Sequence, residues 1–234
     1  MDVAFPTTFL IAIVLSAVAA TSGPARGQTA PTAAEAAAYA GLHAAAQRGN
    51  LAELQVLAAS GADLNSRDGN GRTPVHVATF ARQREAIRAL AGLGANLQLL
   101  DADRYDAVTI ASVADDEETL RVLLSLGASA KLVTSRYDGT ALIAAAHLGH
   151  DGVVRQLIAA GAPLDHVNNL HWTAAIESIV LGDGGPRHQR TLQALIRARA
   201  NLQLADRQGQ TPLALARARA YREMVQMLEA SGAR

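Results

Sequence analysis

Residues 68–78 read Asp-Gly-Asn-Gly-Arg-Thr-Pro-Val-His-Val-Ala, and parts of this phrase return along most of the chain. Each time, a Thr-containing step opens a short Ala-rich segment, and a second apolar segment then ends at Gly-Ala. The glycines that end these second segments are 33, 33 and 34 residues apart, and they are Gly61, Gly94, Gly127 and Gly161. Self-similarity at this fixed spacing predicts a stacked array of helical units, each of which buries its apolar face against its neighbours.

The residue types within the phrase agree with such a unit. Gly71 suits a tight turn because it has no side chain to oppose a left-handed backbone. Thr73 can cap the following helix, and Pro74 fits the first helical position, where its missing N–H costs no hydrogen bond. Gly94 suits the end of the second helix, which we expect over residues 85–93.

The phrase is close to the pattern D-x-x-G-x-T-P-L-H-x-A, and the chain resembles an ankyrin-repeat protein from about residue 34 to residue 234. The resemblance implies an all-α solenoid of about six helix-turn-helix repeats joined by hairpin-like fingers. We expect the repeats at residues 34–67, 68–100, 101–134, 135–167, 168–205 and 206–234. It also implies that His76 bridges backbone groups of adjacent repeats. The residues with such structural roles are Gly71, Thr73, Pro74, His76, Gly94, Gly127, Thr140, Gly161, Thr173, Thr211 and Pro212.

Three segments depart from the repeat. An Ala-rich run at residues 33–40 replaces the first finger and predicts a capping helix, and the acidic run Asp115–Glu118 is expected to open the second helix of repeat three. Repeat five is longer, because Thr173 and Thr211 are 38 residues apart. Since glycines do not continue a helix, we expect residues 182–187 to bulge as a loop before a second helix at residues 191–199.

The N-terminal segment resembles an export signal. Phe9–Ala20 is a run of twelve apolar or small residues, which is shorter than the ~20 that a membrane-spanning helix needs but fits a signal-peptide core. Small residues allow cleavage near Ala20 or, as we favour, after Gly27. We therefore expect a cleaved signal peptide at residues 1–27, a linker at 28–33 and a periplasmic or secreted protein. No Lys or Arg precedes the core, so an uncleaved anchor and a membrane-tethered scaffold remain an alternative.

Composition excludes several classes of function. The chain has no Cys, which excludes disulfides, thiolate metal sites and cysteine nucleophiles, and its formal net charge is zero, which gives no support for nucleic-acid binding. It contains no G-x-S-x-G, phosphate-binding-loop, HExxH or dinucleotide motif. We therefore expect no enzymatic activity, no catalytic residue and no cofactor. A single lysine among the basic residues, with abundant Ala and Gly, suggests a GC-rich bacterial genome.

The histidines do not form a metal-ligand pattern. His147 and His150 are three residues apart, but the ankyrin register places His150 in the turn between two helices, where the resemblance implies a structural role. We therefore expect no metal. A metal- or small-ligand-binding protein that uses His166, His171 and His188, near the repeat-five loop, remains an alternative.

The resemblance implies that the finger tips and first helices line a concave face, and that this face binds another protein. Tyr, Trp and Arg dominate the energetics of protein interfaces. The candidate partner-binding residues on the tips are Arg72, Arg104, Tyr105, Arg136, Tyr137, His171, Trp172 and Arg207. Trp172 is either an anchor for the partner or a cover for the loop of its own repeat. We expect a monomer that contacts neither nucleic acid nor, after signal cleavage, membrane.

Overall fold

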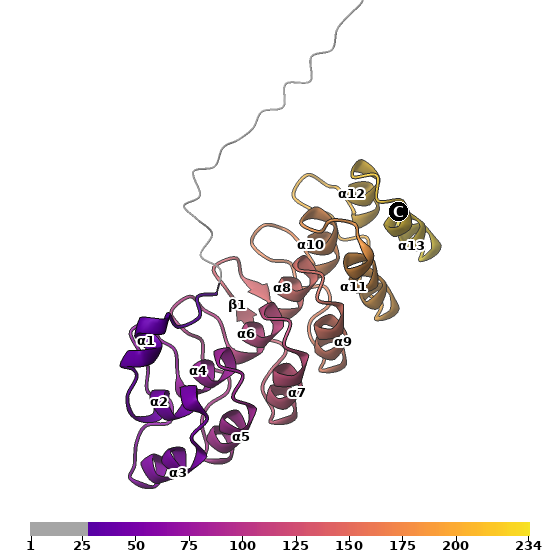
Figure 1. Ribbon diagram of the computed structural model, residues 1–234. Coiled ribbons are helices and arrows are strands. Elements are labelled where there is room, and N and C mark those ends of the chain that lie inside the picture. The colour runs from indigo at the N-terminus through magenta and orange to yellow at the C-terminus, as the bar shows by residue number, and fades with distance from the viewer. Residues whose placement is uncertain (1–27) are drawn as a thin grey trace, which may run out of the picture.

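A computed structural model describes residues 28–234, which form a stack of helix pairs (Figure 1). The predicted signal peptide at residues 1–27 lies outside the described residues. A capping helix, α1 (Ala33–Ala38), precedes the stack, as the Ala-rich run predicts. The first helices of the six repeats are α2 (Gly41–Arg48), α4 (Pro74–Phe80), α6 (Ala107–Val113), α8 (Ala141–His147), α10 (Ala174–Val180) and α12 (Pro212–Ala218). The second helices are α3 (Leu51–Ala59), α5 (Arg84–Gly92), α7 (Glu117–Ser125), α9 (Asp151–Ala159), α11 (Pro186–Arg197) and α13 (Arg222–Ala230).

The arrangement confirms the expected all-α solenoid, in which one layer holds the first helices and the other holds the second helices (Figure 1). Strand content within residues 28–234 is limited to one finger, where β1 (Val133–Thr134) pairs antiparallel with β2 (Gly139–Thr140). In this register Val133 lies opposite Thr140. No helix in the described part of the chain is both long and apolar enough to span a bilayer.

Local capping chemistry sets the start of each first helix. The side chains of Thr140, Thr173 and Thr211 each accept a hydrogen bond from the backbone N–H three residues further on, and Asp106 does the same in repeat three. Repeat two uses a variant: His76 Nδ1 accepts from the Thr73 backbone N–H at 3.0 Å. Caps of this kind fix where the helices begin, and the fingers therefore leave each repeat in the same direction.

The second helices end where the sequence predicts. Gly61, Gly94, Gly127 and Gly161 have φ angles of 81°, 100°, 87° and 79°, which lie in the left-handed region that favours glycine. In repeat five Arg199 takes the same position with a φ of 66°. An L-residue with a side chain is strained in this conformation, so repeat five carries a local cost that the other repeats avoid.

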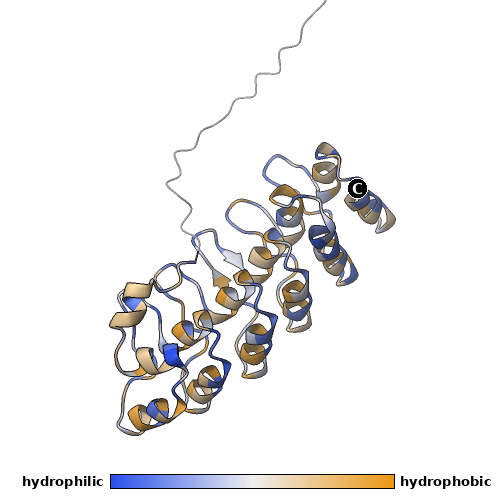
Figure 2. Ribbon diagram, in the orientation of Figure 1, coloured by the Kyte–Doolittle hydropathy of each residue, from blue (hydrophilic) through white to orange (hydrophobic). Residues whose placement is uncertain are grey.

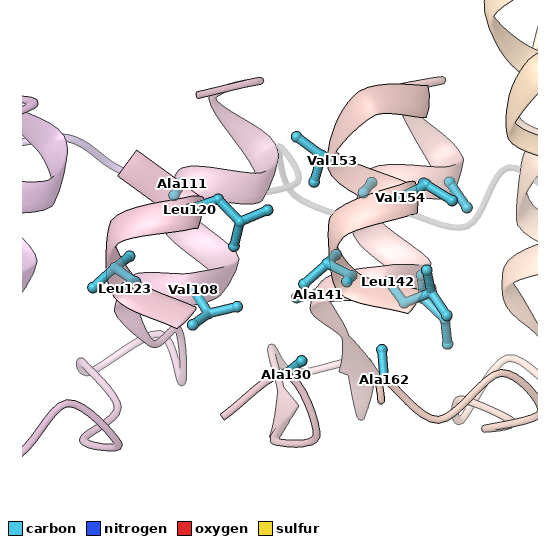
Figure 3. Close-up of a cluster of buried hydrophobic side chains, with 14 of the residues drawn as sticks. Val108, Ala111, Leu120, Leu123, Ala130, Ala141, Leu142, Val153, Val154 and Ala162 are labelled. Carbon is cyan, nitrogen blue, oxygen red and sulfur yellow. The ribbon is translucent and has the colours of Figure 1, made fainter. Parts of the chain in front are cut away.

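The core runs the length of the stack between the helix layers. Hydrophobic residues lie on the helix faces that meet neighbouring helices, while the fingers are largely hydrophilic (Figure 2). In the central repeats Leu120, Leu123 and Leu142 are fully buried, and small residues such as Ala111 and Ala141 separate them (Figure 3). Small residues on the first helices allow close stacking, so each repeat buries its apolar face only with its neighbours in place.

The insertion in repeat five differs from its predicted form. It lengthens the second helix instead of forming only a loop: α11 begins at Pro186 and has 12 residues, whereas α5, α7 and α9 have nine each. The expected start at residue 191 is therefore wrong, because Pro186 sits in the first turn of a helix, where proline is favoured. The remaining connection is pinned: His188 contacts Asp183 Oδ1 at 2.7 Å, and the Tyr221 hydroxyl donates to the Gly182 carbonyl at 2.9 Å.

A candidate binding pocket on the concave face

A pocket of about 250 Å³ opens on the concave face, which is the face made by the fingers and the first helices. Its floor consists of side chains from α6, α8 and α10, including Val113, Ile143 and Ala144. Tyr105 and Tyr137, from successive fingers, line its rim. The pocket thus spans repeats three to five, the centre of the stack, and its apolar and aromatic walls are typical of a binding site for a small group or a side chain.

Glu177 lies in this pocket and is 4% exposed. Its Oε1 accepts a hydrogen bond from Asn168 Nδ2 at 3.0 Å, and its Oε2 lies 3.5 Å from His147 Nδ1. Burial raises the pKa of the Glu177 carboxyl to about 7. Burial, helped by the charges of His188 and His150, lowers the pKa of His147, so this ring is a neutral neighbour near pH 7. No Lys or Arg within residues 28–234 forms an ion pair with Glu177.

Several of the predicted partner-binding residues lie on exposed finger tips. Tyr137 is 39% exposed, and the Arg136 guanidinium lies 5.6 Å from the centre of its ring. Arg104 is exposed and pairs with Asp138 at 3.0 Å across adjacent fingers. His171 and Arg207 are exposed as well, whereas Tyr105 is half-buried at the pocket rim. The structure therefore brings Tyr105 and Tyr137 together at one pocket and spreads the others along the row of tips.

Arg72 is a correction to that set, because it is 1% exposed. Its guanidinium pairs with Asp68 at 2.7 Å and with Glu35 of the capping helix at 2.9 Å. Glu35 thereby ties α1 to the finger of repeat two. Arg72 holds the N-terminal end of the solenoid together, and its side chain is not available to a partner.

Trp172 is half-buried and packs against the hydrophobic core. It precedes α10, whereas the inserted loop follows α10, so the seven-residue helix, which rises ~10 Å, separates the two. Its backbone N–H donates to Asn168 Oδ1 at 3.0 Å. Trp172 thus supports the start of α10, and its truncation would weaken the fold as well as any interface.

The histidines form hydrogen bonds between repeats. Nε2 of His76 bonds the Tyr105 carbonyl at 3.1 Å, which confirms the predicted bridge, and burial lowers the pKa of His76 to about 4. Nδ1 of His150 bonds the Ser112 carbonyl at 2.9 Å in the preceding repeat. His166 bonds the Asp138 carbonyl at 2.6 Å, and His188 bonds the His147 carbonyl at 3.0 Å. The described residues contain no group of three His, Asp or Glu side chains that could hold a metal ion.

Sequence reasoning missed Glu177, Asn168 and Gln28 as pocket residues. A signal for Glu177 existed: the fourth residue after the cap is Val77, Ile110 and Leu215 in repeats two, three and six, and only repeat five has a carboxylate there. Gln28, the first described residue, reaches the pocket from the N-terminal segment, and no such contact between distant segments can be read from the repeat pattern.

The comparisons with known proteins agree with this fold. Residues 42–134 match the family model described as ankyrin repeats in three copies, and residues 137–169 match the single ankyrin repeat. The chain is 34% identical over 190 residues to the putative ankyrin repeat protein YahD of Escherichia coli (strain K12), which covers 81% of this chain and 94% of YahD. The chain therefore belongs to the ankyrin-repeat family.

Solved structures give the same result. An ankyrin repeat domain from Acinetobacter baumannii AYE (ABAYE2397) is 40% identical with a TM-score of 0.77, over 82% of this chain and 98% of that domain. The ankyrin repeat domain of Bcl-3, a member of the IkappaB protein family, is 26% identical with a TM-score of 0.75, over 84% of this chain and 88% of that domain. Ankyrin repeats are generally protein–protein interaction modules and typically non-enzymatic scaffolds.

Proposed function

We propose that this protein is an exported bacterial binding module, without enzymatic activity of its own, which holds a partner protein on its concave face. The observation that carries the proposal is the pocket at the centre of that face, with Tyr105 and Tyr137 at its rim. Aromatic residues at the centre of a concave surface are the type that contributes most to protein interfaces. The exposed Arg104 and Arg136 beside them provide polar contacts at the edge.

Export to the periplasm is part of the proposal. Its support is the apolar run Phe9–Ala20, followed by small residues up to Gly27, and the two bacterial relatives above. Intact mass of the protein purified from its native cells tests it. A chain that begins at Gln28 supports cleavage after Gly27, and a mass near that of the full 24.3 kDa chain supports retention of the segment as an anchor.

Affinity capture from the exported fraction tests the binding role. The double variant Tyr105→Ala with Tyr137→Ala removes the two rim rings, and neither ring belongs to the fully buried core. We expect the wild type to retain one specific partner and the double variant to lose it at unchanged helicity. A matched control is Val56→Ala on α3, in the opposite helix layer, where the side chain is 65% exposed. Capture that survives the double variant would exclude this face.

A further inference from the structure

The Glu177 carboxylate is the most unusual group in the pocket, because it is buried without a counter-charge. An ionised carboxylate can accept about four hydrogen bonds, and here one donor, Asn168, supplies a direct bond. His147 approaches the second oxygen at 3.5 Å, beyond a good hydrogen bond. Unused acceptor capacity in an apolar site is costly unless a donor, and best a cation, arrives to fill it.

The walls suit one kind of cation. A guanidinium is planar, pairs with a carboxylate through two parallel N–H donors and stacks on aromatic rings. Tyr105 and Tyr137 offer such rings at the rim, and the Arg136 guanidinium already lies over one face of Tyr137. The volume of about 250 Å³ is about eight times the ~30 Å³ share of a liquid water molecule, which matches an arginine side chain in size.

The chain itself places a weaker donor at this site. Gln28 lines the pocket, and its amide nitrogen is buried without a hydrogen-bond partner among the described residues. A planar N–H donor is therefore accommodated, but its hydrogen bonds are unmet. A group that pairs with Glu177 would replace Gln28 with a gain in hydrogen bonding.

We propose that the pocket between α6, α8 and α10 binds an arginine side chain of the partner protein, with its guanidinium paired to Glu177 and covered by Tyr105 and Tyr137. This inference rests on the proposed function, and it names the chemistry by which that partner is recognised: an exposed arginine on a protruding segment. The apolar floor of Val113, Ile143 and Ala144 takes the aliphatic stem.

The test uses a tripeptide, acetyl-Gly-Arg-Gly-amide, and its citrulline analogue, which has the same shape but no charge. Both are titrated at pH 8, where the Glu177 carboxyl is ionised, into the isotopically labelled protein, and backbone amide shifts are followed by NMR. We expect the arginine peptide to shift the amides of α8 and α10 with an affinity in the millimolar range. The citrulline peptide should bind at least tenfold more weakly.

Two variants locate the effect. Glu177→Gln keeps the side-chain shape and the hydrogen bond from Asn168, and we expect it to weaken arginine binding at least tenfold. Glu85→Gln is the matched control, since this carboxylate on α5 is exposed and outside the pocket, and binding should be unchanged. Equal binding of the two peptides, or wild-type binding by Glu177→Gln, would overturn the proposal.

Failure of this inference is separable from failure of the proposed function. If the Tyr105 and Tyr137 variant loses the native partner while Glu177→Gln retains it with wild-type affinity, the concave face binds without an arginine anchor. If no partner is captured by the wild type but the arginine peptide binds through Glu177, the pocket exists for a ligand other than a protein, and the proposed function is wrong.

Discussion

Substitution of Glu177 by Gln should stabilise the fold at alkaline pH and leave it unchanged in acid. Burial raises the pKa of Glu177 from 4.5 to about 7, so the folded protein holds a proton that the unfolded chain has already lost between these values. Stability therefore falls as pH rises through this window, and the cost is fully present above pH 7. At ~1.4 kcal/mol per pH unit the cost amounts to about 3 kcal/mol.

The assay is urea unfolding at pH 4.5, 6 and 8, followed by far-UV circular dichroism and by tryptophan fluorescence. Trp172 is the only tryptophan and precedes the helix that carries Glu177, so its emission reports the same repeat. We expect the free energy of unfolding of Glu177→Gln to exceed that of the wild type by about 3 kcal/mol at pH 8 and to equal it at pH 4.5.

Two controls isolate the carboxyl group. Glu85→Gln makes the same charge change on the surface and should alter stability by less than about 0.5 kcal/mol at every pH. His147, 3.5 Å from Glu177, titrates near the same window, so the comparison is repeated in a His147→Gln background, where the pH dependence should persist. A difference that is flat from pH 4.5 to 8, or a Gln variant that is less stable at pH 8, would refute the reasoning.

Three further outcomes follow from the repeat geometry. Gly71→Ala should cost 1 kcal/mol or more, by urea unfolding, because φ is 71° and an added Cβ would lie 2.8 Å from the backbone nitrogen of Ala102; a smaller cost would show that this finger relaxes freely. Arg199→Gly should stabilise the protein by ~0.5 kcal/mol or more, measured in the same way, since it relieves a left-handed residue at an exposed site; a loss of stability would mean that the Arg199 side chain makes a contact worth more than the strain. His76, with a folded pKa of about 4 against 6.5 unfolded, should make the wild type lose stability as pH falls from 6.5 to 4, by up to about 3 kcal/mol relative to His76→Gln, and parallel pH curves for the two proteins would contradict its buried neutral state.

The fold could be predicted because its determinants are local and repeated. Each cap and each positive-φ glycine acts within a few residues, and the 33-residue period brings the same solution back six times. The start of α11 was wrong because Gly182–Pro186 contains residues that break helices, and only the structure shows that Pro186 opens one. Local signals therefore failed at the one place where the repeat was interrupted.

The site was less predictable because its residues come together from distant segments. Arg72 looked like an exposed tip until Glu35, 37 residues away on the capping helix, was found to bury it. The pocket joins Glu177 with Tyr105, Tyr137 and Gln28, and no sequence spacing links these four. Tyr105 and Tyr137 were chosen for residue type and finger position, which still apply, whereas Glu177 required knowledge of what surrounds it.

The central claim, that a partner protein lies on the concave face, is tested most directly by site-specific photo-crosslinking in the native cells. A photoreactive phenylalanine derivative replaces Tyr137 on the concave face in one strain and Val56 on the opposite helix layer in another. The account predicts one crosslinked protein from position 137 and none from position 56. No crosslink from position 137, or the same protein crosslinked equally from both positions, would contradict it.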